Sequence, residues 1–334
     1  MKYSGIGGQA VMEGVMMKNQ DKYAVAVRKP DHEIEVKVSE YTGIVKNKKI
    51  RNMPVLRGVF SFIESLVLGM QVLTYSASFF EEEEDEREEK ASVSEEQRRK
   101  KESKEEKQEK AVMGGTVVLS VVLAVAIFMM LPYYISSFFR KVIASQWAVA
   151  LLEGVIRLVI FVGYVALISL MKDIKRVYMY HGAEHKCINC IEHGLELNVE
   201  NVRKSSKQHK RCGTSFLFFV MFVSVIVCFF ITAESQVLRV VLRLALLPVI
   251  AGISYGFIRL AGSSENKIVN ALSKPGMLLQ NMTTKEPDES MVEVAIEAVS
   301  AVFDWEEFLN HYNDDGKTEN RWIKQNCQRK VQSQ

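Results

Sequence analysis

The sequence predicts an integral membrane protein of mixed fold, with about four transmembrane helices, a small N-terminal β-containing cytoplasmic domain and a helical cytoplasmic loop. Two observations predict this fold class. Apolar residues gather in long tracts almost free of charge, although the mean hydropathy of the 334-residue chain is only +0.01. Basic residues gather beside these tracts, as they do at the cytoplasmic ends of membrane helices. We therefore expect the polar chemistry of the chain to lie on the cytoplasmic side of a membrane.

Residues 1–52 are expected to form the small N-terminal domain. Within it, Tyr23–Arg28 and Glu33–Val38 alternate apolar and polar residues around a proline-containing turn, which is the pattern of a β-hairpin. The preceding segment, Gly7–Gly14, matches neither a Walker loop nor a dinucleotide-binding fingerprint. We interpret it as a structural turn, in which Glu13 would reach the central loop if the two cytoplasmic parts pack together.

Residues 53–80 are apolar but carry Arg57, Glu64 and Gln71 about one or two helical turns apart. This spacing favours an amphipathic helix on the bilayer surface, and a tilted or re-entrant helix would give the same pattern. Residues 81–111 are acidic at first and then mixed and basic, without apolar residues for a core. We expect a charged linker there, and a partner-binding acidic arm is the alternative.

Four tracts have the length of roughly 17 to 25 residues that a hydrocarbon core about 30 Å thick requires. Basic residues precede the first tract and fill the loop between the second and the third, so the positive-inside rule places both termini and that loop in the cytoplasm. The expected spans are residues 112–134, 147–171, 214–233 and 237–261.

The last part of the chain is expected to be soluble. Residues 262–311 form a C-terminal cytoplasmic segment, in which Ser290–Phe303 has the apolar spacing of an amphipathic helix. This helix is expected to pack against the N-terminal domain or the central loop. Residues 312–334 are polar and are expected to form a mobile tail.

The composition excludes several classes of protein. A net charge of +3 is too small to indicate a nucleic-acid-binding protein. The odd count of five cysteines indicates reduced thiols and not a disulfide framework. The N-terminus has neither the charged nor the apolar region of a cleavable signal peptide, so internal helices are expected to direct insertion. The expected partners are the lipid bilayer and a membrane-associated substrate, and the sequence does not identify protein partners.

The strongest chemical signal lies in the central loop, residues 172–213, which holds four of the six histidines. If the helix of the second span continues past Lys172, the residues His181, Glu184 and His185 lie on one helical stripe. They match the motif H-x-x-E-H, in which two imidazoles bind a metal and the glutamate acts as general base on water. Gly194 is expected to end this helix, and the third ligand would come from Glu192, His193, His209 or Cys212.

Two other interpretations of these residues stay open. Histidines near a bilayer surface often only donate hydrogen bonds to headgroups or backbone carbonyls, and three fixed letters are a weak fingerprint. Cys187 and Cys190 form a C-x-x-C pair that would hold a structural zinc if Cys212 or a histidine closed the site.

Several longer motifs occur along the chain in a fixed order. They are Ile6–Met17, Tyr180–Lys186, Glu192–Glu196, Asn201–Arg203, Arg211–Phe216, Pro275–Gln280 and Thr283–Pro287. Together they resemble the YqhQ-like family of bacterial membrane proteins, and the resemblance covers nearly the whole chain except the charged linker and the C-terminal tail. It implies a multi-pass protein of the bacterial cell membrane and a predicted metal-dependent enzyme, without a settled reaction or substrate.

Charged residues inside the expected spans form a second candidate site. Glu153 and Arg157 lie one turn apart in the second span, and Arg243 lies in the fourth. Glu153 and Arg243 are both about 9 Å from the external end of their spans, at about 1.5 Å per residue, so they are expected to meet. A pair that fixes helix packing is the favoured interpretation, and a transport path is the alternative.

Together these patterns predict a metal-dependent enzyme of the hydrolase class at the cytoplasmic membrane face. A divalent metal, zinc or manganese, would be bound by His181 and His185, with Glu184 as base or ligand. A non-catalytic membrane scaffold or a small-solute transporter is the alternative.

Overall fold

The computed structural model describes residues 2–43, 54–88, 112, 114–231, 236–264 and 266–311. The chain divides into two compact units. One unit, here called the site unit, comprises Met1–Phe80, Ile168–Phe219 and Ala251–Gln334. The other, the helical unit, comprises Glu81–Leu167 and Val220–Ile250. The expected tail at 312–334 and most of the expected linker, residues 89–111, lie outside the described residues.

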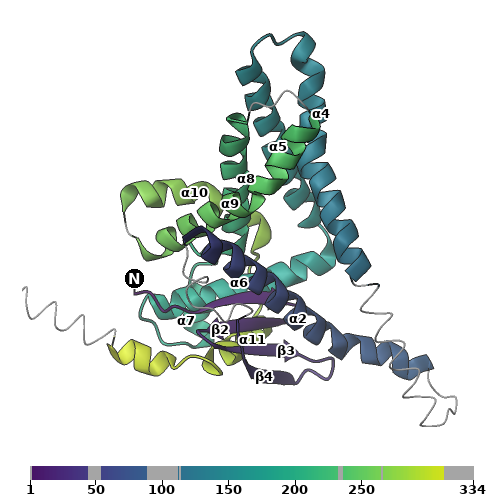
Figure 1. The fold of residues 1–334 in the computed structure, drawn as a ribbon. Coiled ribbons are helices and arrows are strands. Elements are labelled where there is room, and N and C mark those ends of the chain that lie inside the picture. The colour runs from purple at the N-terminus through teal and green to yellow at the C-terminus, as the bar shows by residue number, and fades with distance from the viewer. Residues whose placement is uncertain are drawn as a thin grey trace, which may run out of the picture. The chain divides into compact units, whose positions relative to one another are not determined.

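The site unit contains a four-stranded antiparallel sheet of order β1-β2-β3-β4 (Figure 1). The predicted hairpin is confirmed, because β3 pairs with β4 and places Val25 opposite Lys37. Part of the segment interpreted as a turn forms the first hairpin instead. The turn itself is limited to Met12 and Glu13. The strands are β1 (Gly7–Val11), β2 (Gly14–Asn19), β3 (Lys22–Arg28) and β4 (Ile34–Glu40).

Gly14 explains why the first hairpin lacks an ordinary strand signal. A Cβ at Gly14 would lie 2.3 Å from the carbonyl oxygen of Ala26 on β3, so a larger residue does not fit where these strands meet. Glu13 takes a positive φ of 49°, which closes the turn at a position that non-glycine residues rarely occupy. Glycine is depleted in ordinary strands, and the apolar alternation on which strand prediction depends is therefore weak in this segment.

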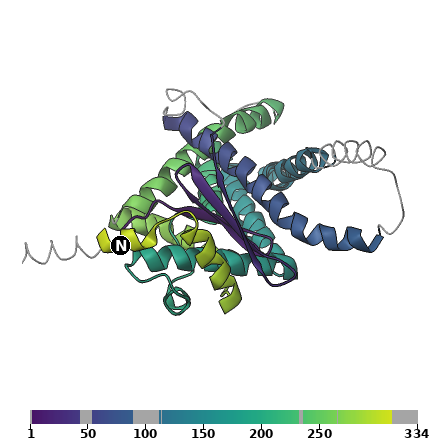
Figure 2. The same cartoon turned by 90° about the horizontal axis from the view of Figure 1, so that it is seen from below.

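Helices cover both faces of the sheet (Figure 2). Side chains of a strand alternate between faces, so Val11 and Met16 pack on one side against Leu68 of α2 (Pro54–Glu88). On the other side Val15 and Met17 pack in the core that includes α6 (Lys172–Glu192) and α11 (Glu289–Ser300). The C-terminal amphipathic helix is α11, and it contacts the N-terminal sheet and the central loop helices α6 and α7 (Val199–Lys204).

Among the residues that the structure describes, four helices are long and apolar enough to cross a membrane, judged by length and composition. Three of them match expected spans. The expected span 214–233 is occupied by α8 (Gly213–Phe229), which at 17 residues is shorter than these four. The fourth long apolar helix lies instead within α2, for which the sequence favoured a surface position. The four are Gly58–Phe80, Gly114–Lys141, Gln146–Ile168 and Val241–Gly262.

The helical unit contains most of the apolar helices. Residues 114–125 are helical and continue through a π-helical turn, η1, into α4, and a short 3-10 turn, η2, follows. The unit also holds most of α5 and the parts of α8 and α9 that lie in residues 220–250. The bounds are η1 (Ala126–Met130), α4 (Leu131–Phe138), η2 (Phe139–Lys141), α5 (Gln146–Ile168) and α9 (Gln236–Ser263).

The helix of the second expected span does not continue past Lys172, which was the condition considered for the histidine stripe. The second span ends at Ile168, and Met171 is extended with ψ of 135° before α6 (Lys172–Glu192) begins. His181, Glu184 and His185 still lie on one helical stripe, because all three belong to α6. Two further expectations are confirmed: Gly194, with φ of 78°, ends α6, and Asn198 caps α7 (Val199–Lys204) by accepting the N–H of Asn201.

Two expected boundaries also differ from the structure. Residues 81–88, assigned to the linker, continue α2, since glutamate and arginine are good helix formers and no glycine or proline interrupts them. The C-terminal segment holds a second helix that the sequence analysis did not identify, α10 (Lys267–Thr283).

Candidate metal site

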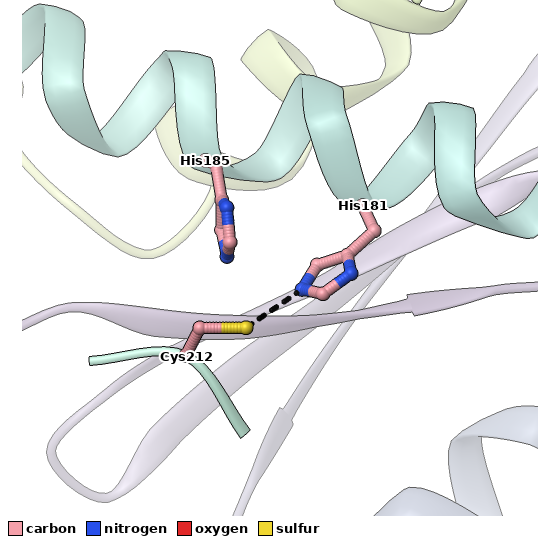
Figure 3. Close-up of side chains that lie close together, drawn as sticks. All are labelled: His181, His185 and Cys212. Atoms are coloured by element: carbon pink, nitrogen blue, oxygen red, sulfur yellow. Dashed lines mark hydrogen bonds between the residues drawn. The ribbon is translucent and has the colours of Figure 1, made fainter. Parts of the chain in front are cut away.

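Three side chains of the site unit converge on one point. His181 and His185 project from α6, and Cys212 comes from the loop just before α8 (Figure 3). One ligand atom of each residue lies within 4.8 Å of the others. The helical repeat puts the two imidazoles on one face of α6, and the loop after α7 returns the thiol to that face. Of the four expected third ligands, the structure therefore brings Cys212 to the histidines.

Backbone carbonyls fix the orientation of both imidazoles. Nδ1 of His181 lies 2.9 Å from the carbonyl oxygen of Thr283, and Nδ1 of His185 lies 2.6 Å from that of Lys207. A carbonyl only accepts hydrogen bonds, so each Nδ1 must carry the proton. In a neutral imidazole, Nε2 then keeps its lone pair. This arrangement is the usual outer shell of metal-binding histidines.

The charges of the cluster suit a metal as well. Burial alone would raise the pKa of the Cys212 thiol, but the imidazoles of His181 and His185 outweigh it and hold that pKa well below its usual value. The lowered pKa favours the thiolate of Cys212, which is the form that binds metals. Burial would lower the pKa of His181, yet Cys212 and Glu184 raise it to about 9. Without a metal, the proton on His181 balances the thiolate.

Glu184 lies beside the three ligand atoms without joining them. Its carboxylate is 3.9 Å from Nε2 of His181. Burial raises the pKa of Glu184 above its ordinary value, although His185 and His181 oppose the shift. A Cβ at Gly8 would lie 2.9 Å from Cγ of Glu184, so the glycine lets β1 approach α6 closely here. Glu184 is thus a buried carboxyl group with a raised pKa that lies beside the three ligand atoms.

A cavity of about 480 Å³ opens onto this cluster. Its walls come from β1, α2, α6, the loop before α8 and the part of α9 in the site unit. The lining is mixed: Leu68 and Ile258 are apolar, whereas Lys18 and Arg259 are basic. The volume is that of a typical small-molecule pocket, so a substrate group has room beside the cluster.

Glu192 and His209 form a separate buried cluster. Glu192 is fully buried and accepts hydrogen bonds from the backbone N–H and the hydroxyl of Ser4, at 2.9 and 2.7 Å, and from Arg211. Burial would raise the pKa of Glu192, but His209 and Arg211 lower it to about 2. These contacts hold the N-terminal segment and the residue before Cys212 in place.

The other expected candidates lie elsewhere. Nδ1 of His193 donates to the carbonyl of Asn189, 2.7 Å away, at the end of α6. Burial raises the pKa of Cys187 well above the usual value and that of Cys190 to about 11, so both thiols are protonated. In the described part of the chain, Cys212 lies with His181 and His185 and does not lie with Cys187 and Cys190. The C-x-x-C interpretation therefore receives no support from the geometry.

Glu13 does reach α6, as expected, but away from the histidines. Its carboxylate pairs with Arg176 and lies 3.3 Å from the hydroxyl of Tyr180. This ion pair fastens the first turn of the sheet to α6. It supports the site without forming part of it.

Several residues that support the site were not identified from the sequence. Thr283 holds His181 through its carbonyl, and the side chain of Gln280 bonds both the N–H and the carbonyl of His209, at 2.9 and 2.8 Å. Gly8 makes room for Glu184. All three lie in motifs that carry the family resemblance. In the sequence, only their place in these motifs, far from the histidines, indicated that Thr283, Gln280 and Gly8 matter for the site.

The charged residues of the expected spans meet in the helical unit. Nη2 of Arg243 lies 3.0 Å from one carboxylate oxygen of Glu153, and Arg157 lies 2.9 Å from the other. Arg157 also contacts Ser224 and Cys228. All three charged side chains are buried. The expected contact between α5 and α9 is therefore present, with one carboxylate between two guanidinium groups.

Comparisons with known proteins agree with the resemblance described above. The family model "Protein of unknown function (DUF1385)" matches residues 53–305. The chain is 34% identical over 297 residues to the uncharacterized protein YqhQ of Bacillus subtilis (strain 168), covering 87% of this chain and 90% of that protein. No solved structure matches the chain. The chain therefore belongs to the DUF1385 family of proteins of unknown function.

Proposed function

We propose that this protein is a metal-dependent hydrolase that acts at the cytoplasmic face of the bacterial cell membrane. The observation that carries the proposal is the convergence of two carbonyl-oriented imidazoles and one thiolate beside a buried carboxylate. Three protein ligands are typical of catalytic zinc sites, which keep a fourth position open for water or substrate. Thiolate and imidazole donors favour zinc over manganese, which prefers oxygen ligands.

The roles of the residues follow from their positions. A bound zinc ion would supply Lewis-acid activation of water and of the substrate. His181, His185 and Cys212 would hold the ion, and the carbonyls of Thr283 and Lys207 would keep both imidazoles oriented. Glu184 accepts the proton of the attacking water, and its raised pKa helps it to pass that proton to the leaving group. The cavity holds the group that is hydrolysed.

The packing of α2 supports a position at the membrane surface. One side of α2 packs on the sheet, whereas Leu66 and Met70 on another side are exposed. A helix with a sheet along one side cannot be surrounded by lipid, because the edge groups of an open sheet are not satisfied in hydrocarbon. We therefore favour α2 as a surface helix over α2 as a span. The same surface placement would bring the cavity near membrane-associated substrates.

The enzyme proposal is tested by turnover of full-length protein in nanodiscs with zinc added. Ester, phosphoester and peptide probes would be offered to the wild type and to Glu184→Gln. We expect saturable, zinc-dependent hydrolysis of one probe class, and a loss of about 10²–10⁴-fold in kcat for Glu184→Gln, which removes the proton acceptor but keeps the shape. Zinc-loaded protein that hydrolyses no probe class would instead favour the non-catalytic scaffold or the transporter.

The cytoplasmic orientation is tested by topology reporters. Fusions after Lys110, within residues 190–210 and at the C-terminus should all report a cytoplasmic position, because the basic flanks oppose translocation. Reporters between the first and second spans, near residue 143, should report the external side and serve as the control. An external signal from residues 190–210 would contradict the orientation and the expectation of reduced thiols.

A further inference from the structure

Helix α10 buries mostly polar residues and exposes an apolar stripe. The side that faces the protein carries Ser273, Gly276, Gln280 and Thr283, with Leu279 as the only large apolar residue among the buried positions of this helix. The side next to it exposes Ile268, Leu272 and Leu278, at 70%, 50% and 65%. Ala271 and Pro275 complete this exposed stripe. Helices on the surface of water-soluble proteins have the reverse arrangement.

Polar side chains of α10 are hydrogen-bonded to the segment before Cys212 and to the first turn of α8. Gln280 bonds the backbone of His209 and the hydroxyl of Ser215, the latter at 2.7 Å. Asn281 accepts a hydrogen bond from Gln208 at 2.7 Å. The rotation of α10 about its axis is therefore fixed by specific contacts. The apolar stripe cannot turn inward without breaking them.

The position of α10 in the chain favours lipid as the cover of the stripe. Only four residues separate the long apolar helix Val241–Gly262 from the start of α10 at Lys267. At no more than about 3.6 Å per residue, α10 must begin within about 18 Å of the end of that helix. Lys267 and Lys274 are exposed beside the stripe, as basic residues commonly are where helices meet anionic headgroups.

We propose that α10 lies in the membrane interface, with the stripe formed by Ile268, Ala271, Leu272, Pro275 and Leu278 in contact with the lipid of the bilayer. The carbonyl of Thr283 on the same helix holds His181. A helix is about 10 Å across. The metal site therefore lies about one helix diameter from the lipid, and its substrates reach it from the membrane surface.

Spin labels measure this placement directly in full-length protein in phosphatidylcholine and phosphatidylglycerol nanodiscs. Spin labels would be attached to cysteines introduced as Leu272→Cys and Leu278→Cys. Cys187, Cys190, Cys212 and Cys228 are buried and are kept. Cys327 is replaced by serine, so that the label reacts with the introduced cysteine. The control is Leu195→Cys, an exposed leucine in the loop between α6 and α7. Ile268→Cys replaces any labelled position that lowers the yield of folded protein.

We expect the labels on α10 to collide more with oxygen, which concentrates in lipid, than with a water-soluble nickel chelate. The label at position 195 should show the opposite preference. Equal access of the nickel chelate to positions 272, 278 and 195 would overturn the proposal, since the stripe would then face water. Exclusion of both collision partners would also overturn it, because protein would then cover the stripe. The measurement needs neither metal nor turnover, so its result is independent of the proposed hydrolase function.

Discussion

Replacing His181 or His185 by alanine, or Cys212 by serine, is expected to abolish stoichiometric zinc binding. Each change removes one of the three converging ligand atoms. Loss of an outer-shell partner alone typically lowers metal affinity by about 10–100-fold, so loss of a ligand should lower it further. The measurement is metal content by mass spectrometry of elements after purification without chelator and resupply with zinc. We expect about one zinc per chain in the wild type and almost none in the three variants.

Matched variants separate this site from the alternatives. Glu184→Gln should keep its zinc, because Glu184 lies beside the ligand set. Cys187→Ser and Cys190→Ser should also keep it. Loss of zinc in Glu184→Gln would make Glu184 a ligand and not a base. Loss in the Cys187 or Cys190 variants, with zinc retained in the histidine variants, would contradict the proposed site and support a structural C-x-x-C zinc.

Zinc affinity should also depend on pH in a defined direction. Because Cys212 and Glu184 raise the pKa of His181 to about 9 against the opposing effect of burial, a metal must displace its proton at neutral pH. Affinity should therefore rise as the pH rises toward 9. Competition titrations with a zinc chelator at several pH values measure this. An affinity that does not change between neutral pH and pH 9 would count against His181 as a ligand.

Replacing Glu153 by glutamine is expected to destabilise the helical unit by about 3–5 kcal/mol, because two buried guanidinium groups then lose their carboxylate. Thermal unfolding of the detergent-solubilised protein measures the loss. The matched control is the double variant Glu153→Gln with Arg243→Met, which removes both sides of the contact between α5 and α9. We expect the double variant to be more stable than the sum of the two single losses predicts. Strictly additive losses would contradict the coupling.

The features that depend on local spacing could be predicted from the order of residues alone. The apolar tracts gave three of the four long apolar helices, because length and composition alone decide whether a helix is long enough to cross a bilayer. The motif placed His181, Glu184 and His185 on one face of a helix, because the helical repeat is fixed. The ends of α6 and α7 were predicted at Gly194 and Asn198, since a left-handed glycine and an asparagine cap act within a few residues.

Only the tertiary structure decided which residues meet across long stretches of chain. Four candidates for the third ligand were equivalent in the sequence, and the return of the loop before α8 selected Cys212. The carbonyl that orients His181 belongs to Thr283, 102 residues away. The first hairpin and the mostly polar buried side of α10 were likewise missed. In each case the residue is suited to a contact with a residue that is distant in sequence. Local periodicity carries no information about such a contact.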